Sequence, residues 1–267
     1  MGDAAFAPAL PRPALHCQEA GSFLRCLPAR SVDLVLTDPP YGHGRQEWDH
    51  GDSPALDEEW WDALWRCCKP TTPVVVFSQG MFTARVKLAG RFFRYTLIWE
   101  KNKSTGFLNA SKMPLRAHED ICVFYRRLPT YNPQMDEGRS PQKWCRRTGT
   151  GDNYDDTRGG ENLRAGATDR YPRSVLPFPV VNNDDAERIH PNQKPLALLR
   201  YLIRTYSNEG DLVIDPFAGS ASTLIAAMSE GRRSSGCDTS AEYVQAARRR
   251  IDRAVAAGAQ TSIQYPP

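Results

Sequence analysis

The stretch SVDLVLTDPPYG, residues 31–42, joins a short apolar run to an acid, two prolines and an aromatic residue. Its first seven residues are mostly aliphatic and β-branched, which predicts a buried parallel strand. A second stretch, DLVIDPFAGSAST at residues 211–223, has the order strand, small-residue turn, helix. Asp38 and Asp215 therefore both stand where a predicted strand ends, although they are far apart in the chain.

The segments around these two stretches alternate between strand and helix patterns. Ser53 as N-cap and Pro54 in the first turn predict that a helix begins there, and Gly90 predicts the end of another. Such alternation predicts an α/β fold in which a parallel sheet is covered on both faces. The expected strands are residues 73–78, 92–100, 120–126, 211–215 and 232–238, and the expected helices are 53–69, 81–90, 195–207, 221–231 and 240–258.

The middle of the chain departs from this pattern. Residues 101–188 are rich in Gly, Pro, Asn, Asp and Arg, which predicts long loops around the one strand at 120–126. Residues 101–173 hold 14 Lys and Arg against 9 Asp and Glu, so this segment carries the positive excess of a chain whose net charge is +3. A basic segment on a near-neutral body is typical of a protein that binds a polyanion, although a solvated loop region has the same composition.

Bulk composition is that of an ordinary globular protein, with 40% hydrophobic and 24% charged residues among 267. No apolar run approaches the roughly 18 residues of a membrane span, and residues 1–15 lack the pattern of a secretory signal. We therefore expect a cytoplasmic protein with no membrane partner. The seven cysteines are odd in number and show no CxxC spacing, so we assign no metal.

The turn after residue 215 has the chemistry of a nucleoside site. Gly219 lets the backbone approach a ligand. Asp238 lies about 20 residues after Asp215 in the sequence, and an acid at this separation from such a turn commonly binds ribose hydroxyls. The GxGxxG fingerprint of dinucleotide sites is absent, and Asp215 would repel a pyrophosphate. An acid there suits an ammonium or sulfonium group, so a nucleoside bearing an amino acid, such as S-adenosylmethionine, fits both acids.

Taken together, these motifs resemble the permuted, β-type family of DNA N6-adenine/N4-cytosine methyltransferases, in which DPPY precedes the cofactor motif. The resemblance is carried, in family order, by TDPPYG, the segment GFLNASKMPLRAHEDICVFYR, HPNQKP, DPFAGS and GRRSSGCD. It implies a Rossmann-like S-adenosylmethionine-dependent methyltransferase sheet with helices on both faces. Residues 1–100 and 189–267 would form the catalytic and cofactor-binding domain, and residues 101–188 an inserted target-recognition region. The strands before Asp38 and Asp215 would be neighbours.

The resemblance also assigns roles to residues. The Asp38 carboxylate and the Pro39 carbonyl would hold an exocyclic amino group, and Tyr41 would stack on a base flipped out of the duplex. Lys194 would meet the carboxylate of the cofactor, and Asp238 its ribose. The catalytic set is Asp38, Pro39, Pro40 and Tyr41. The cofactor set is Cys17, Asp38, Gln193, Lys194, Asp215, Pro216, Phe217, Ala218, Gly219, Ser220, Ala221 and Asp238.

Two positions depart from the family pattern. Ala221 stands where the family usually has Gly, so its Cβ is expected to crowd the cofactor turn. His16 replaces an acid that in the family meets the adenine of the cofactor.

Several functions stay open at this stage. The first expectation is site-specific N6-adenine methylation of double-stranded DNA, as in restriction-modification. The alternatives are N4-cytosine methylation, methylation of RNA or of a protein glutamine, and a catalytically impaired DNA-binding relic. A homodimer is compatible with the sequence.

Overall fold

The computed structural model describes residues 12–42, 53–138, 167–182, 185, 188–189 and 192–257. Eight strands form one sheet in the order β1-β8-β7-β2-β3-β5-β4-β6. Among these eight, β5 runs antiparallel to both of its neighbours, so the sheet is mixed rather than purely parallel as the sequence predicted. The strands are β1 (Ala14–Cys17), β2 (Leu34–Thr37), β3 (Val74–Ser78), β4 (Phe93–Thr105), β5 (Arg116–Phe124), β6 (Val175–Pro177), β7 (Leu212–Asp215) and β8 (Arg233–Asp238).

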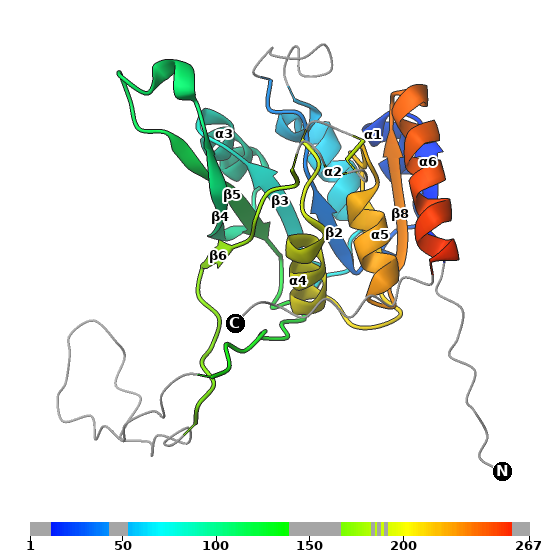
Figure 1. Cartoon of the computed structure of the whole chain (residues 1–267). Helices are drawn as coiled ribbons and strands as arrows, with labels where there is room; N and C mark the ends of the chain where they lie inside the picture. The colour runs from blue at the N-terminus through cyan, green and yellow to red at the C-terminus, as the bar shows by residue number, and fades with distance from the viewer. Residues whose placement is uncertain are drawn as a thin grey trace. The chain divides into compact units, whose positions relative to one another are not determined.

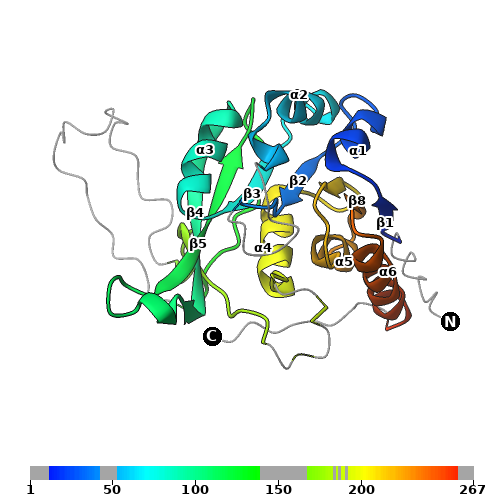
Figure 2. The ribbon, with the colours of Figure 1, turned by 90° about the horizontal axis from the view of Figure 1, so that it is seen from above.

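Helices cover both faces of the sheet, which confirms the predicted α/β class (Figures 1 and 2). Alternate strand residues point to opposite faces, and both sets are apolar, so each face supports its own core. Val35 and Val74 pack with α1 and α2 on one face, and Leu36 and Val75 pack with α4 on the other. The helices are α1 (Ala20–Cys26), α2 (Glu58–Cys67), α3 (Met81–Ala89), α4 (Leu196–Tyr206), α5 (Ser222–Ser229) and α6 (Ala241–Ala256).

Strands β2 and β7 are parallel neighbours, which confirms the adjacency that the family resemblance implied. Leu34 pairs with Val213, and Val35 with Ile214. From β2 the chain continues through α2 to β3 on one side, and from β7 it continues through α5 to β8 on the other. The connections therefore diverge between β2 and β7, and in open α/β sheets ligands bind at that point, beyond the carboxyl ends of the strands.

Several element boundaries differ from those predicted. The expected helix at 53–69 divides into a 3-10 turn, η2 (Pro54–Leu56), and α2, because Asp57 has an extended backbone and interrupts the helix. Ser53 caps the short turn, as its side chain accepts a hydrogen bond from the Ala55 N–H. Helix α3 stops at Gly90 as predicted. Strands β1 and β6 and helix α1 were not predicted.

Much of the described chain within residues 101–188 belongs to the main sheet. The described chain before Pro133 and after Arg173 forms one compact unit, and the described residues between them, 133–138 and 167–173, belong to a second. Strands β5 and β6 and the second half of β4 all pair within the main sheet, and the assignment of residues 101–188 as a target-recognition region stays a prediction. In the second unit, Asp136 and Arg170 form an isolated bridge. Most of the basic loop, including Arg146 and Arg147, lies outside the described residues. In the described part of the chain, no helix combines the length and apolarity needed to span a bilayer.

Candidate active site

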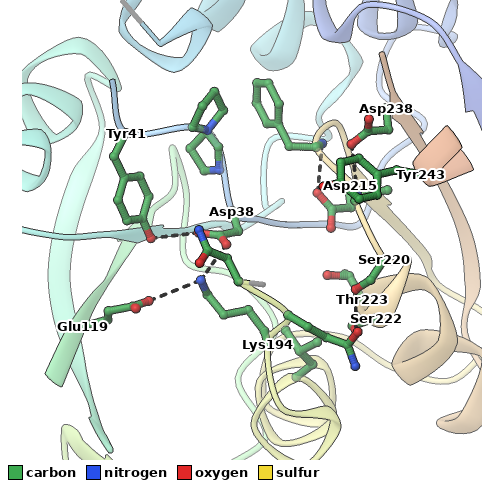
Figure 3. Close-up of a pocket in the computed structure, with 18 of the residues that line it drawn as sticks. Asp38, Tyr41, Glu119, Lys194, Asp215, Ser220, Ser222, Thr223, Asp238 and Tyr243 are labelled. Atoms are coloured by element: carbon green, nitrogen blue, oxygen red, sulfur yellow. Dashed lines mark hydrogen bonds and ion pairs between the residues drawn. The ribbon is translucent and has the colours of Figure 1, made fainter. Parts of the chain in front are cut away.

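A cavity of about 850 Å³ opens beyond the carboxyl ends of β2, β7 and β8 and is lined by residues of both motifs. Asp38 follows β2 directly, and Asp215 and Asp238 are the last residues of β7 and β8. The Thr37 hydroxyl, one residue before DPPY, donates a hydrogen bond of 2.7 Å to Asp215 Oδ1. The two motifs therefore meet through a direct contact. They also share the cavity, where Figure 3 shows Asp38 and Asp215.

The DPPY segment is held in a defined orientation. The Tyr41 hydroxyl donates to Asp38 Oδ1 at 2.8 Å, and the Tyr41 ring stacks on Phe82 with centroids 4.9 Å apart. Burial and the nearby Asp38 carboxylate raise the pKa of Tyr41 well above its ordinary value, so its hydroxyl stays protonated and remains a donor. Phe82 is buried in α3, which fixes the plane of the tyrosine ring.

Beside this segment, Lys194 lies between two carboxylates. Its Nζ is 2.5 Å from Asp38 Oδ2 and 3.3 Å from Glu119 Oε2, and the Lys194 side chain is 9% exposed (Figure 3). Glu119, on β5, also accepts from Lys101 at 2.5 Å. The cluster thus alternates in charge, and every member has an opposite charge at contact distance.

The alternation of positive and negative charges sets the direction in which the pKa of each group in the cluster is shifted. Burial raises the pKa of Asp38 and the Glu119 charge adds to this, while Lys194 opposes both. Burial would also raise the pKa of Glu119, but Lys194 and Lys101 outweigh it and the pKa is lowered. Burial alone would lower the pKa of Lys194, yet the two carboxylates raise it. Lys194 is therefore a permanent ammonium group beside a carboxylate that is easier to protonate than usual.

Asp215 is more deeply buried than Asp38. It is 3% exposed, and burial raises its pKa to about 6, although hydrogen bonds from Thr37, Thr223 and the Phe217 N–H lower it. In the described residues no ion pair with Asp215 is present, so its charge is balanced by dipoles alone. A buried carboxylate of this kind favours a cationic ligand.

The turn after β7 has the backbone form that a bound ligand requires. Gly219 has φ +47°, and a Cβ built there would have no heavy atom within 4 Å, so the backbone faces open space. Its N–H donates to Asp238 Oδ2 at 3.1 Å, and Asp238 Oδ1 accepts from the Ser240 N–H. Each oxygen keeps a free lone pair, so Asp238 can still accept from hydroxyl groups. Tyr243 lines the same end of the cavity.

Most of the residues singled out from the sequence line this cavity. They are Asp38, Pro39, Pro40, Tyr41, Gln193, Lys194, Asp215, Pro216, Phe217, Ala218, Gly219, Ser220 and Asp238. Cys17 and Ala221 do not line it. Cys17 pairs with Asp238 at the end of β1, and Ala221 is fully buried among Leu224 and Val244. Ala221 is therefore part of the core, and its effect on the cofactor turn stays a prediction.

Other lining residues were missed from the sequence. Glu119 directly precedes the strand predicted at residues 120–126, and nothing in its neighbourhood marks it as part of a site. Glu19 lines the cavity three residues after His16, so an acid is present near the place where the family pattern expects one. Gln18 and Tyr243 also line it. Among the described residues, no group of three or more metal-ligating side chains comes together.

Comparisons with known proteins identify the family of this chain. A family model described as DNA methylase, for N6 and N4 methylation, matches residues 32–249, which is most of the chain. The chain belongs to the DNA N6-adenine/N4-cytosine methyltransferase family.

Individual members of this methyltransferase family are similar over most of their length. The chain is 28% identical to the type II methyltransferase M.HpaI of Haemophilus parainfluenzae over 89% of this chain and 74% of that protein. It is 29% identical to the DNA adenine methyltransferase YhdJ of Escherichia coli over 86% of this chain and 79% of that one. The solved complex of M1.HpyAVI with SAM has the same fold, with a TM-score of 0.58 at 20% identity over 90% and 99% of the two chains.

S-adenosylmethionine is the methyl donor of this methyltransferase family. The residues that line the cavity also fit S-adenosylmethionine chemically. Asp215 offers a buried negative charge with no cationic partner among the described residues, Asp238 offers acceptors for hydroxyl groups, and Gly219 leaves space for close approach.

Proposed function

We propose that this methyltransferase transfers the methyl group of S-adenosylmethionine to the N6 amino group of an adenine flipped out of duplex DNA at a specific sequence. It would act in the cytoplasm. The single observation that carries the proposal is the hydrogen bond between Thr37 and Asp215, because it fixes the acceptor motif and the donor motif in one cavity.

Asp38 and Pro39 would position the acceptor nitrogen. The lone pair of an exocyclic amino group is delocalised into the ring, and two acceptors that grip its two N–H groups favour a pyramidal nitrogen with a freer lone pair. The Asp38 carboxylate is one such acceptor and the Pro39 carbonyl the other. Proline suits this position since its φ is fixed and it has no competing N–H. In the structure Asp38 already accepts from Lys194 and Tyr41, and its remaining lone pairs are available to the amino group.

Asp38 would not remove a proton before methyl transfer. A carboxyl group whose ordinary pKa is about 3.9 is too weak a base for a neutral aryl amine, even after burial has raised its pKa. The proton leaves the methylated, cationic nitrogen instead, and Asp38 is in place to accept it. The main contribution of the site is then alignment of the reacting atoms.

The donor end would be held by residues of the second motif. S-adenosylmethionine, when bound, supplies the electrophilic methyl group. Asp215 would bind its cationic part and Asp238 its ribose, while Phe217, which stacks on Trp60 with centroids 5.9 Å apart, would form an apolar wall. Lys194 contacts Asp38 and lines the same cavity, so its ammonium group would also bind the carboxylate of S-adenosylmethionine.

One experiment tests the proposal directly. The purified protein is incubated with genomic DNA and isotopically labelled S-adenosylmethionine, and the DNA is digested and its nucleosides separated. Labelled N6-methyladenine supports the proposal. Labelled N4-methylcytosine assigns the other amino group, and no label in DNA refutes methyl transfer to it. Size-exclusion chromatography of the same preparation tests the homodimer.

A further inference from the structure

The hairpin between β4 and β5 carries exposed apolar side chains at its tip, residues 106–115. Phe107 is 70% exposed, Leu108 99% and Met113 58%. Gly106 has φ +97°, and the 3-10 turn η3 (Phe107–Asn109) follows it, so the tip has a defined backbone rather than an extended one. In Figure 1 the hairpin extends beyond the end of the sheet. Single exposed apolar residues are ordinary, but three within one short tip indicate a contact surface.

The apolar tip is accompanied by positive charge only. Residues 101–118 contain Lys101, Lys103, Lys112 and Arg116 and no Asp or Glu. Lys101 is engaged with the buried Glu119, but Lys103, Lys112 and Arg116 are exposed. Their known contacts are with neutral groups, since Lys103 donates to Asn182 and Arg116 to Gln79. Such a surface is complementary to a DNA duplex, because apolar side chains can contact stacked bases and cationic side chains can contact phosphates.

The base of the hairpin belongs to the active-site cavity. Lys103, Thr105 and Arg116 line the cavity that also contains Asp38 and Tyr41. The tip therefore begins directly outside the end of the cavity at which the acceptor base would enter. A base that leaves the stack opens a gap in the duplex, and apolar side chains that enter such a gap offset part of the cost of unstacking.

We propose that Phe107 and Leu108 insert into the duplex beside the target base and keep the stack open while the base occupies the cavity. Lys103, Lys112 and Arg116 bind the flanking phosphates. This inference deepens the proposed function, because it rests on a base being flipped, but it holds for adenine and for cytosine alike.

The test compares two DNA substrates. Wild-type protein is first used to map the methylated sequence. Phe107→Ala/Leu108→Ala is then assayed on a duplex with a normally paired target and on one whose target lies opposite an abasic site, where extrusion is already easy. We expect the rate on the paired duplex to fall at least about tenfold and the rate on the abasic duplex to stay within about twofold of wild type. Leu88→Ala, which removes a side chain 83% exposed on α3, is the matched control and leaves both rates unchanged.

A second measurement separates insertion from other roles. With 2-aminopurine at the target position, wild-type protein raises the fluorescence on binding, and the double variant raises it much less, while cofactor affinity by calorimetry is unchanged. Equal losses on both substrates, or no loss on either, would overturn the inference. So would binding of wild-type protein to anionic phospholipid vesicles through this tip while the variant methylates paired DNA normally. If wild-type protein methylates no DNA, the proposed function fails and this inference, which rests on it, fails with it. Methylation that is intact in wild-type protein and is lost equally on both substrates in the variant overturns the inference alone.

Discussion

Replacing Lys194 by Gln should make methylation more sensitive to acid. The Lys194 ammonium lies 2.5 Å from Asp38 Oδ2, and the Asp38 side chain is 24% exposed, so the contact is only partly screened by water. Lys194 favours the charged form of Asp38, and the grip on the amino group requires that form. Removing Lys194 therefore raises the pKa of Asp38, and activity is lost at a higher pH as the pH falls.

The size of the shift follows from the contact. A hydrogen bond to a charged group contributes about 1.5–3 kcal/mol, and one pH unit corresponds to 1.36 kcal/mol. The acid limb of the turnover profile should thus move up by about 1–2 pH units. At alkaline pH, where Asp38 is charged in both proteins, the two profiles should approach each other. Glu119 keeps its partner Lys101 in the variant, so the neighbouring carboxylate should not become an unpaired charge.

The assay is the initial rate of methyl transfer as a function of pH at saturating S-adenosylmethionine, so that weaker cofactor binding does not enter the profile. Lys69→Gln is the matched control, since it removes a lysine 2.5 Å from Asp33 that lies outside the cavity. An acid limb that stays in place, or that moves to lower pH, would refute the role given to Lys194. A loss of equal size at every pH would show that Lys194 acts by some other means than the charge of Asp38.

Further outcomes follow from the acids and the turn. Asp38→Ala should lower turnover at least about 100-fold while DNA binding in a gel-shift assay largely survives. Cofactor affinity by calorimetry should weaken as the pH falls through about 6, because protonation removes the Asp215 charge, and Asp215→Asn should abolish that dependence. Asp238→Ala should weaken cofactor binding about tenfold or more, and an unchanged affinity would exclude the ribose role. Ala221→Gly should change the free energy of unfolding by less than about 1 kcal/mol, because relief at φ +58° offsets the entropy of Gly and the lost methyl burial. Ala226→Gly, inside α5, lacks that relief and should cost more, as thermal denaturation would show.

Much of the fold could be predicted because its signals are local. The aliphatic runs before Asp38 and Asp215 predict strands by composition alone, and Gly90 ends α3 where its lack of a side chain predicts. That β2 and β7 pair came from resemblance rather than from either segment, since a parallel pairing leaves no mark in the two sequences. Strand β4 was predicted only to Glu100, because the following Lys, Asn and Ser residues have low strand propensity. Pairing with β5 carries the strand on to Thr105.

The candidate site was predicted as far as its motifs extend. DPPY and DPFAGS mark the residues after two strands, and those residues do share a cavity. Glu119 carries no such mark. Its role depends on a salt bridge to Lys194 and on burial beside Asp38, and both arise only when three distant segments meet. A contact made by tertiary packing has no signal in the spacing of one sequence.

The reversed direction of β5 explains the position of two features that the sequence did not predict, Glu119 and the apolar hairpin tip. Strands β2, β3 and β4 point the same way, so their carboxyl ends lie at the cavity edge of the sheet, whereas β5 begins at that edge. Asp120 pairs with Ser78, the last residue of β3, which places Glu119 just beyond the end of β3 on the side of the cavity. The same reversal makes the link between β4 and β5 a hairpin at the cavity edge. A parallel strand in this position would begin at the opposite edge of the sheet, and it would carry Glu119 far from the acceptor base. One antiparallel strand in an otherwise parallel sheet thus provides both the acid that faces Lys194 and the hairpin that reaches the duplex.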